Sequence, residues 1–412
     1  MIQTVAVLGL GYVGFPLAVL LVKSKKYKVY GLDISPIAVK RANSALKSSS
    51  FDASSNFENI KYADIVVVCV PTPVKKKYQP DYEPLKKACE SIVKNSTNRQ
   101  LVIIESTINP GTCEEVVLPV LEKYGKVAGR DFLLAHCPER IDPGNKKWTL
   151  LNIPRNVGGI DEESAACAAQ FYKSFLKSNI KVLSTIKAAE ATKIVENTFR
   201  DINIAYVNEL AMSFDALGID LLEVIEGSSS KPFAFMPHYP GVGVGGHCIP
   251  VDPYYLIERA LHSGFEHYFL SMARKINNGM PAYTVGLLEK ELQKNGMNLR
   301  RVTVGLLGLS YKKDIADMRE SPAVKVLEIL KKKRVKVLTF DPFVPHSSTA
   351  KSLEDLLKKC EAVVLATGHS VFKKITPTLL KKCGVKVVID GRNFLQKDRI
   401  LQAGIVYKGI GH

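Results

Sequence analysis

The segment 245–253 places a thiol and a carboxylate close together in a loop rich in glycine and proline. It reads Gly-Gly-His-Cys-Ile-Pro-Val-Asp-Pro, so Cys248 and Asp252 are four residues apart. A structural cysteine normally lies in an apolar run, whereas this loop lets other groups approach its backbone. Cys248 is therefore a candidate nucleophile, because a thiolate can add to an aldehyde and later release an acid from a thioester. Asp252 is the candidate base for the water that hydrolyses the thioester.

Lys193 and Asn197 are candidates for stabilising the oxyanion that such chemistry develops. They lie four residues apart in a stretch of helical periodicity, so they share one face of the predicted helix. Taken alone, a lysine in a helix is ordinarily a solvated surface residue. The spacing by itself leaves that alternative open.

Residues 9–14 read Gly-Leu-Gly-Tyr-Val-Gly directly after a strand-like run, which is typical of a dinucleotide-binding turn. Gly9 permits the tight turn, Gly11 lets a pyrophosphate approach the backbone, and Gly14 allows the next helix to pack closely. The N-terminus of that helix offers N–H groups to the phosphates. Asp33 ends the second strand, where a carboxylate binds ribose hydroxyls and repels a 2′-phosphate. The pattern predicts NAD as the cofactor, unless Asp33 instead caps the helix that follows.

Strand-like and helical stretches alternate through roughly the first 185 residues, as in a doubly wound α/β domain. The strands are predicted at 4–8, 28–32, 65–70, 101–105 and 132–135. The middle ones are nearly continuous apolar runs, which indicates a parallel sheet buried on both faces. Turn residues follow the strands at 9–14, 71–73 and 109–111.

The central part of the chain looks helical, and the α/β pattern returns after it. Apolar residues recur at helical spacing over 188–217, which predicts one long helix closed by Gly218. A glycine-rich loop at 241–246 precedes further helix over 254–293. Strands are predicted again at 302–306, 336–340, 362–366 and 385–389. We therefore expect three domains, 1–186, 187–294 and 295–412.

The last domain carries a glycine turn of its own at 305–310, and Asp341 ends a later strand. The glycine spacing departs from the dinucleotide fingerprint. We therefore expect a related nucleotide, rather than a second NAD, at this sheet edge.

Composition indicates a globular protein of several domains. The chain has 412 residues, of which 46% are hydrophobic and 24% charged. It has no apolar run of the roughly 18 residues that a membrane span needs, and no signal-peptide pattern, so we expect a cytoplasmic protein without membrane partners. The eight cysteines show no paired spacing, which indicates reduced thiols and no metal site.

The formal net charge of +17 does not by itself predict nucleic-acid binding. The lysines form short runs spread along the chain, several towards the ends of predicted helices, where cations suit the helix dipole. These runs are 75–77, 331–333, 358–359, 373–374 and 381–382. A small polyanion such as a nucleotide fits the excess charge at least as well, so no nucleic-acid partner is expected.

Five ordered motifs resemble those of the UDP-glucose/GDP-mannose dehydrogenase family, almost from end to end. They are the turn at 9–14, Glu-Ser-Thr at 105–107, the helix motif from 189 to Asn197, the loop at 245–252, and Tyr-Lys-Lys-Asp at 311–314 with Arg-Glu-Ser-Pro at 319–322. The resemblance implies two Rossmann-like doubly wound domains joined by a central, mainly helical domain. It further implies NAD in the first domain, a UDP-sugar in the cleft between domains, and a homodimer or higher homo-oligomer built on the long helix.

Carried over by position, the resemblance assigns roles to individual residues. It makes Cys248 the nucleophile and Lys193 and Asn197 the oxyanion partners. Asp252 assists proton transfer, and Thr107 and Glu139 position water and substrate. The implied cofactor contacts are Gly9, Gly11, Tyr12, Val13, Gly14, Asp33, Pro71, Thr72, Thr107 and Arg319. The implied UDP-sugar contacts are Glu139, Arg140, Lys193, Asn197, Tyr239, Gly243, Gly245, Tyr311 and Lys312.

One segment bears on the sugar. Residues 138–144 read Pro-Glu-Arg-Ile-Asp-Pro-Gly, similar to family members that act on UDP-N-acetylhexosamines, whereas UDP-glucose enzymes tend to have Asn-Pro-Glu-Phe there. The Pro-Tyr-Tyr-Leu at 253–256 also fits that branch. The resemblance therefore implies oxidation of the C6 alcohol to the uronic acid with UDP-GlcNAc as the favoured substrate, and UDP-ManNAc or UDP-glucose as alternatives.

Two other functions compete with this interpretation. A β-hydroxyacid dehydrogenase also pairs a dinucleotide-binding domain with a helical lysine and asparagine, but it needs neither the Cys248 loop nor a second α/β domain. A non-catalytic sugar-nucleotide binding protein could keep the fold. No catalytic residue of the family pattern is missing here, which disfavours the binding protein.

Overall fold

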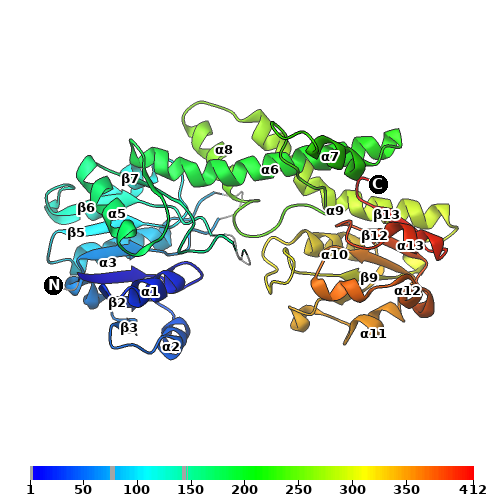
Figure 1. Cartoon of the computed structure of the whole chain (residues 1–412), viewed down its shortest axis with the longest axis horizontal. Coiled ribbons are helices and arrows are strands. Elements are labelled where there is room, and N and C mark those ends of the chain that lie inside the picture. Colours follow the sequence, from blue (N-terminus) through cyan, green and yellow to red (C-terminus); the bar gives the residue numbers. More distant parts are fainter. Residues whose placement is uncertain (1–2, 75–78, 142–144, 146) are drawn as a thin grey trace. The chain divides into compact units, whose positions relative to one another are not determined.

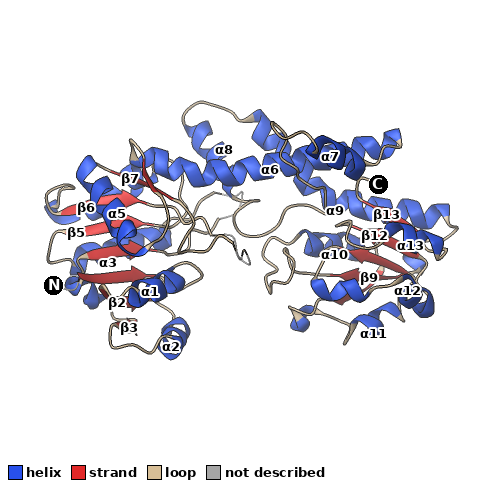
Figure 2. Ribbon diagram, viewed as in Figure 1, coloured by secondary structure: helices blue, strands red, loops and turns tan. Residues whose placement is uncertain are grey.

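The computed structural model of the chain describes residues 3–74, 79–141, 145 and 147–412. The lysine run at 75–77 and residues 142–144 of the 138–144 motif lie outside the described residues. The chain forms two compact units, one made of Met1–Glu196 with Tyr254–Phe265 and the other of Asn197–Pro253 with Glu266–His412. Each unit contains one β-sheet with helices packed on it (Figures 1 and 2). The three-domain division at 186 and 294 stays a prediction.

The sheet of the first unit has the strand order β3-β2-β1-β4-β5-β6-β7-β8. Its strands are β1 (Gln3–Leu8), β2 (Tyr27–Leu32), β3 (Phe51–Ser54), β4 (Ile65–Val68), β5 (Gln100–Ile104), β6 (Phe132–His136), β7 (Arg155–Gly159) and β8 (Ile180–Val182). Strand β1 lies between β2 and β4, so the order reverses there and opens a crevice at its carboxyl end. The five predicted strands are parallel to one another, and β7, which was not predicted, runs antiparallel to β6.

Helices cover both faces of this sheet, as the apolar strands require. Alternate residues of β1 enter different cores, Val5 and Val7 on one side and Ala6 and Leu8 on the other. Helices α1 (Gly14–Lys23), α2 (Pro36–Ala45) and α5 (Glu162–Phe175) contribute to the first core, and α3 (Glu83–Asn95) contributes to the second. The doubly wound architecture therefore places the ends of β1, β4, β5 and β6 at one edge.

The central helices are α6 (Ile186–Leu217), α7 (Leu221–Ser229), α8 (Asp252–His262) and α9 (Tyr268–Lys294). The predicted long helix is confirmed as α6, and Gly218 follows it with a φ of +71°. The helix predicted over 254–293 is instead two helices. Gly264, with a φ of +82°, lies between α8 and α9, where left-handed backbone ends a helix. Among the described residues, no helix is both long and apolar enough to cross a membrane.

The sheet of the second unit is parallel, with the order β10-β9-β11-β12-β13. Its strands are β9 (Thr303–Leu307), β10 (Lys336–Phe340), β11 (Ala362–Leu365), β12 (Val387–Asp390) and β13 (Val406–Gly409). Helices α9 and α10 (Pro322–Lys332) contribute to one core, and α11 (Leu353–Leu357), α12 (Pro377–Cys383) and α13 (Lys397–Gln402) to the other. The predicted fold class, two Rossmann-like parts with a helical region and one long helix, is confirmed.

Candidate active site

The glycine turn after β1 has the geometry that a dinucleotide requires. Gly9 has a φ of +93°, and a Cβ there would lie 2.7 Å from the Cys69 carbonyl oxygen. A Cβ at Gly14 would lie 1.9 Å from the Gly9 oxygen, so both positions exclude side chains. A Cβ at Gly11 would meet no described atom within 4 Å, and this exposed backbone is open to a pyrophosphate. The turn therefore fits the predicted cofactor.

The start of α1 adds N–H groups to this turn. Val13 occupies the N-cap position, and its side chain cannot accept a hydrogen bond from the helix. The first N–H groups of α1 can therefore bind a phosphate. The Tyr12 side chain beside them is 65% exposed.

Asp33 joins the end of β2 to the glycine turn. Its Oδ2 accepts a hydrogen bond from the Leu10 N–H at 2.7 Å, and its Oδ1 accepts one from the Ser35 N–H at 2.8 Å. The following helix α2 is capped by Ser35, whose side chain accepts from the Ala38 N–H. The alternative that Asp33 is that cap is therefore wrong. The half-exposed carboxylate lies beside the turn, where a ribose is expected.

Glu139 and Lys193 form one group in the first unit. Glu139 follows β6, and the Lys193 Nζ on α6 donates to its carbonyl oxygen and lies 3.7 Å from its Oε2. The two side chains are 8% and 11% exposed, so Lys193 is not an ordinary solvated lysine. The neighbouring Arg140 is engaged by α6, because its Nη2 lies 2.6 Å from the Glu196 Oε1.

Thr107 lies in the loop after β5, which is fixed from several sides. The Thr72 hydroxyl donates to the Thr107 carbonyl oxygen at 2.7 Å, and the Tyr255 hydroxyl donates to the Thr72 carbonyl oxygen at 2.7 Å. Pro71, also a predicted cofactor contact, is exposed beside Thr72. Thr72 therefore supports the Thr107 loop in addition to its predicted role.

Glu190 ties that same loop to α6. Its carboxylate accepts hydrogen bonds from the Gly111 N–H at 2.5 Å and the Cys113 N–H at 2.7 Å. Glu190 is 1% exposed, and burial raises the pKa of its carboxyl group. It lies three residues before Lys193, on the same side of α6. Sequence reasoning did not single out Glu190, although it stands inside the quoted helix motif.

A buried ion pair lies at the end of β5. The Arg155 Nη1 is 3.0 Å from the Glu105 Oε1, and both side chains have no exposed surface. The Tyr172 hydroxyl donates to the same oxygen at 2.5 Å. Burial raises the pKa of the Glu105 carboxyl group, while the Arg155 cation opposes the rise. The pair fixes the strand end two residues before Thr107.

The candidate nucleophile loop, residues 241–252, belongs to the second unit and ends where Asp252 meets Asn197. The Cys248 carbonyl oxygen accepts from the Val251 N–H at 2.9 Å and from the Asp252 N–H at 2.8 Å, which turns the loop into α8. The Asp252 Oδ2 accepts from the Asn197 Nδ2 at 2.5 Å. Asp252 is 3% exposed and Cys248 is half-buried. The Asn197 amide thus holds the Asp252 carboxylate, and the backbone of Cys248 is bonded to that of Asp252 one helical turn later.

The segment 311–322 packs against the glycines of this loop. A Cβ at Gly245 would lie 2.7 Å from Pro322 Cδ, and one at Gly246 would lie 2.8 Å from the Tyr311 ring. The Gly246 N–H donates to the Arg319 carbonyl oxygen at 3.1 Å. Both glycines are therefore required by the close approach of a second motif.

Arg319 lies near the candidate nucleophile. Its Nη2 is 2.6 Å from the Asp317 Oδ2, and this contact raises the pKa of the guanidinium, with a smaller contribution from Cys248. Burial lowers the pKa of His247, and the Arg319 charge lowers it further. Both effects disfavour the charged form of the His247 ring.

The other predicted sugar contacts lie in the same unit. Gly243 has a φ of +131°, and a Cβ there would lie 3.1 Å from the Asn277 carbonyl oxygen. Lys312 follows Tyr311 after the second glycine turn, and both are half-buried. Tyr239 is 63% exposed, so at most part of its ring is held by the protein.

The second glycine turn, at 305–310, has the same geometry as the first, but contacts within the protein occupy its acid, Asp341. Gly308 has a φ of +84°, and the Leu309 N–H donates to the Asp341 Oδ2 at 2.7 Å, as Leu10 does to Asp33. The same oxygen also accepts from the Ser310 N–H at 2.8 Å and lies 3.0 Å from the His369 Nε2. Asp341 has no exposed surface, so it cannot reach a ribose.

Three family models match successive parts of the chain. They are the UDP-glucose/GDP-mannose dehydrogenase NAD binding domain over residues 42–176, the central domain over 187–279 and the UDP binding domain over 305–397. Together these matches account for most of the chain. The chain belongs to the UDP-glucose/GDP-mannose dehydrogenase family.

Similar proteins span nearly the full length of this dehydrogenase. It is 36% identical to the UDP-N-acetyl-D-mannosamine dehydrogenase of Pyrococcus horikoshii, over 99% of each chain. It is also 36% identical to the UDP-N-acetyl-D-glucosamine 6-dehydrogenase of Pseudomonas aeruginosa, over 90% of this chain and 92% of the other. The solved structure of the Pyrococcus horikoshii UDP-D-ManNAc dehydrogenase superposes with a TM-score of 0.90 and covers 99% of both chains.

The predicted cofactor and enzyme class are confirmed by these matches. The chain is an NAD-dependent UDP-sugar dehydrogenase, with an NAD binding domain near one end and a UDP binding domain near the other. The open backbone at Gly11 and the carboxylate of Asp33 suit the dinucleotide. When bound, NAD supplies the hydride acceptor for oxidation.

Sequence reasoning missed one cation of the dehydrogenase. The Arg392 Nε donates to the Ala366 carbonyl oxygen at 2.9 Å, and a Cβ at Gly241 would lie 2.6 Å from the Arg392 Nη1. Its guanidinium therefore lies against the start of the nucleophile loop. The available signal was its position directly after the Asp-Gly at 390–391, which ends a strand in the same way as the other site turns.

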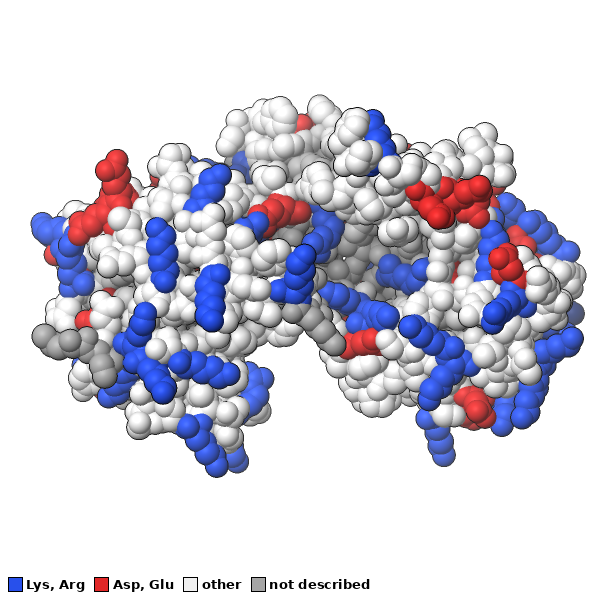
Figure 3. Space-filling view, in the orientation of Figure 1, with Lys and Arg blue, Asp and Glu red and all other residues white. Residues whose placement is uncertain are grey.

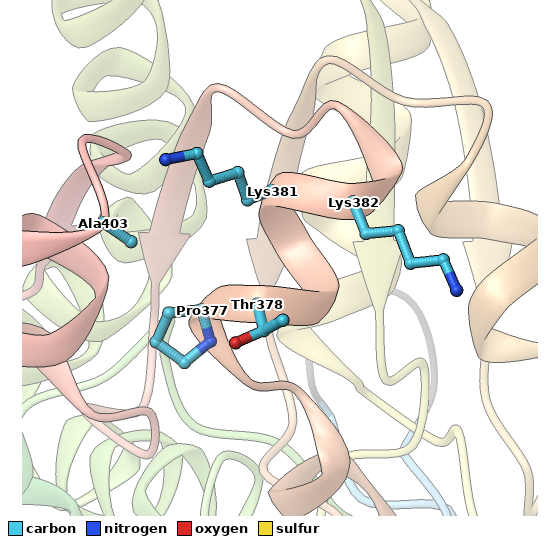
Figure 4. Close-up of a pocket in the computed structure, with 5 residues that line it drawn as sticks. All are labelled: Pro377, Thr378, Lys381, Lys382 and Ala403. Carbon is cyan, nitrogen blue, oxygen red and sulfur yellow. The ribbon is translucent and has the colours of Figure 1, made fainter.

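The face shown in Figure 3 and one hollow beside α12 give no sign of a second site among the described residues. Figure 3 shows Lys and Arg spread over the visible face with Asp and Glu among them. A hollow of about 370 Å³ lies beside α12, lined by Pro377, Thr378, Lys381, Lys382 and Ala403 (Figure 4). The two lysines point in different directions there. The predicted site residues are absent from its lining, so we assign it no role in the reaction.

Proposed function

We propose that this dehydrogenase oxidises the C6 alcohol of a UDP-N-acetylhexosamine to the carboxylate in two NAD-dependent steps. The observation that carries the proposal is Cys248, whose backbone is bonded to that of Asp252, a carboxylate held by Asn197; a single alcohol oxidation needs no thiol. The two relatives that are 36% identical and named for UDP-N-acetyl sugars support the choice of sugar class.

We also propose which N-acetylhexosamine is the substrate. The segment 138–144 favours an N-acetylhexosamine over glucose, and UDP-GlcNAc is our first candidate. UDP-ManNAc is the second candidate, since a relative of equal identity is named for it. The two sugars differ only in the orientation of the acetamido group at C2, so both belong in every assay.

The reaction proposed for Cys248 has three stages. Loss of a hydride and a proton converts the C6 alcohol to an aldehyde. The Cys248 thiolate adds to the aldehyde carbon to give a thiohemiacetal, and loss of a second hydride and proton leaves a thioester. Water then cleaves the carbon–sulfur bond and yields the carboxylate and the free thiol. One sugar, two NAD⁺ and one water thus give one uronic acid, two NADH and three protons.

The remaining residues stabilise charge and move protons in this scheme. Lys193 and Asn197 donate hydrogen bonds to the oxyanion that forms when sulfur or water attacks. Asp252, held by the Asn197 amide, takes the proton of the hydrolytic water. Glu139 and Thr107 position water and substrate, supported by the Lys193 and Thr72 contacts described above.

Domain roles and assembly are part of the same proposal. We infer that residues 1–186 bind NAD, residues 187–294 supply the nucleophile loop and a dimer interface, and residues 295–412 bind the UDP group. The buried Asp341 supports a non-dinucleotide role for the second glycine turn, because it leaves no acid there for a ribose.

The deciding experiment counts NADH formed per UDP-sugar consumed, with UDP-GlcNAc, UDP-ManNAc and UDP-glucose run in parallel. We expect two NADH per UDP-N-acetylhexosamine. Cys248→Ala should retain binding of NAD and UDP-sugar but form no uronic acid. One NADH per sugar in the wild type, or normal acid formation by Cys248→Ala, would remove the thioester route.

A further inference from the structure

Four polar side chains of the second unit form a buried path between the central helices and the nucleophile loop. Asp201 and Asn208 belong to α6, and Arg274 and Asn277 belong to α9. None of the four is more than 3% exposed. Buried polar groups need partners, so their contacts reveal what the path holds in place.

The helix end of the path is an ion pair. The Arg274 Nη1 donates to the Asp201 Oδ1 at 2.5 Å. The Asn277 Nδ2 donates to the same oxygen at 2.8 Å and to the Asp201 carbonyl oxygen at 2.9 Å. These bonds fix the orientation of the Asn277 amide, because its NH₂ group faces Asp201.

The loop end of the path is Asn208. Its Nδ2 donates to the Asn277 Oδ1 at 2.8 Å, and its Oδ1 accepts from the Gly241 N–H at 2.9 Å. Asn277 and Asn208 each donate a hydrogen bond towards the helix end of the path and accept one from the loop end. All the amide hydrogen bonds of the path therefore run in the same direction. The path ends on the backbone of the loop that leads to Cys248.

The loop is held at two further points before Cys248. Gly243 lies against the Asn277 backbone, where a Cβ would be 3.1 Å from the carbonyl oxygen. The Gly246 N–H donates to the Arg319 carbonyl oxygen at 3.1 Å. The path therefore defines where the loop starts, and these later contacts direct its course to the nucleophile.

Such a path is a costly way to fill space between helices. Apolar side chains of similar size stabilise a core as well as a buried ion pair does, and they need no partners. A hydrogen-bonded amide differs in that it specifies one position and one direction for its partner. The four polar side chains provide one feature that apolar ones could not, which is a fixed position for the Gly241 N–H.

We propose that Asn208, oriented by Asn277 and the Asp201–Arg274 pair, is a positioning residue that places Cys248 for oxidation of the aldehyde. The inference rests on the proposed function, in which the thiol acts only in the second half of the reaction. Removing Asn208 should therefore slow the aldehyde half more than the alcohol half. A general loss of stability would slow both.

The experiment compares Asn208→Ala with Asn43→Ala, a control in the first unit that loses two hydrogen bonds of the same kind at an exposed position. Asn43 makes two hydrogen bonds to Ala53 of 2.8 and 2.9 Å, the same lengths as those of Asn208. For Asn208→Ala we expect NADH per sugar to fall from two towards one, with aldehyde released. Oxidation of added UDP-hexosamine aldehyde should slow by about 10- to 100-fold, as for a nucleophile misplaced by about 1 Å.

A second readout follows the loop without catalysis. Hydrogen exchange of the peptide that contains Gly241 should be faster in Asn208→Ala and unchanged in Asn43→Ala. Asn208→Asp covers the case that the alanine variant does not fold, because it turns a carboxylate oxygen against the Asn277 Oδ1 and so removes the bond that orients the acceptor for the Gly241 N–H. It should also lower the NADH yield per sugar.

Two outcomes separate this inference from the proposed function. A wild-type enzyme that forms one NADH per sugar would refute the thioester route itself. The second outcome is that the wild type forms two NADH, and that a folded Asn208→Ala or Asn208→Asp also forms two and exchanges the Gly241 N–H at the wild-type rate. That outcome would overturn only the role of Asn208.

Discussion

At both Asp33 and Asp341, a strand-end carboxylate accepts a hydrogen bond from the residue after a left-handed glycine. The two acids differ in what else they bind. Asp33 remains half-exposed, while Asp341 is fully buried against Ser310 and His369. Burial pushes the pKa of the Asp341 carboxyl group up, but the hydrogen bonds from His369 and the backbone outweigh it and hold the pKa well below its usual range. The same turn thus leaves its acid accessible to a ligand in one unit and occupies it with protein contacts in the other.

Asp33→Asn tests the ribose contact with little change to the turn. The amide oxygen can still accept from the Leu10 N–H, but the negative charge is lost. We expect the ratio of kcat/KM for NAD to that for NADP to fall by about tenfold, the effect of about 1.4 kcal/mol from one charge-assisted hydrogen bond and one repulsion. Asp52→Asn removes an exposed carboxylate from β3 of the same unit and should leave the ratio unchanged. An unaltered ratio in Asp33→Asn would mean that the ribose is recognised by other groups.

An unusual local setting marked some residues of the candidate site in the sequence, whereas Lys193, Asn197, Glu139 and Thr107 were assigned through the resemblance to a family. Cys248 and Asp252 stand in a glycine- and proline-rich loop, and Gly9 to Gly14 follow a strand. Arg155, Glu190 and Asn208 have no such signal. Their partners are far away along the chain, so only the folded structure brings them together.

The strands that could be predicted also had a clear signal in the local sequence. The buried strands β4, β5 and β6 are continuous apolar runs and were predicted, whereas β3, β7, β8 and β13 were missed. Strand β7 reads Arg-Asn-Val-Gly-Gly and β8 has three residues, so both depend on pairing with a neighbour. Strand propensity is weak where tertiary pairing decides the conformation.

Glu190 is the contact by which α6 holds the Thr107 loop. Glu190→Gln keeps one acceptor oxygen but turns an NH₂ group towards the second N–H, so one of the two hydrogen bonds is lost. We expect a loss of about 1–3 kcal/mol in local stability and faster hydrogen exchange at Gly111 and Cys113. Glu114→Gln, which breaks a surface pair with Lys187, should cost less than about 1 kcal/mol. Equal exchange in both variants would contradict the role of Glu190.

Asp220 caps helix α7 and adds a pH dependence to its stability. Its Oδ1 accepts from the Leu222 N–H at 2.9 Å, and its Oδ2 lies 2.6 Å from the His412 Nδ1 and 3.0 Å from the Lys397 Nζ. Burial raises the pKa of Asp220, but His412 and Lys397 outweigh it and lower the pKa to about 2. The folded-state pKa thus lies below the unfolded value of about 3.9.

The charge of Asp220 therefore stabilises the fold above about pH 4, and this contribution is lost as the pH falls towards 2. Asp220→Asn should unfold about 1 kcal/mol more easily at any pH from 5 to 8, a modest value because the site is partly exposed. The difference from the wild type should shrink below pH 4 and vanish only below about pH 2. Asp220→Ala also loses the cap and should cost about 1 kcal/mol more. Urea unfolding at a series of pH values measures each quantity, and a difference that grows as the pH falls would refute the assignment.

An exposed apolar face of α6 bears on how the whole molecule assembles. Phe199 and Tyr206 lie seven residues apart on one side of α6 and are 48% and 57% exposed, an apolar face that a second copy would cover. We expect light scattering to give twice the chain mass of 45.4 kDa. Tyr206→Lys should shift the mass to that of one chain, whereas Ile37→Lys on the exposed side of α2 should not. A wild type of single-chain mass would refute the dimer.

The chain path through the first unit has a consequence for synthesis. Residues 254–265 belong to that unit, where the Tyr255 hydroxyl binds the Thr72 carbonyl oxygen and Arg259 pairs with Glu115, yet they follow residue 196 only after a long excursion into the second unit. A ribosome adds about 5–20 residues per second, so the NAD-binding part waits several seconds for its last helix. During that interval the nascent chain exposes the surface around Thr72 and Glu115 that α8 later covers.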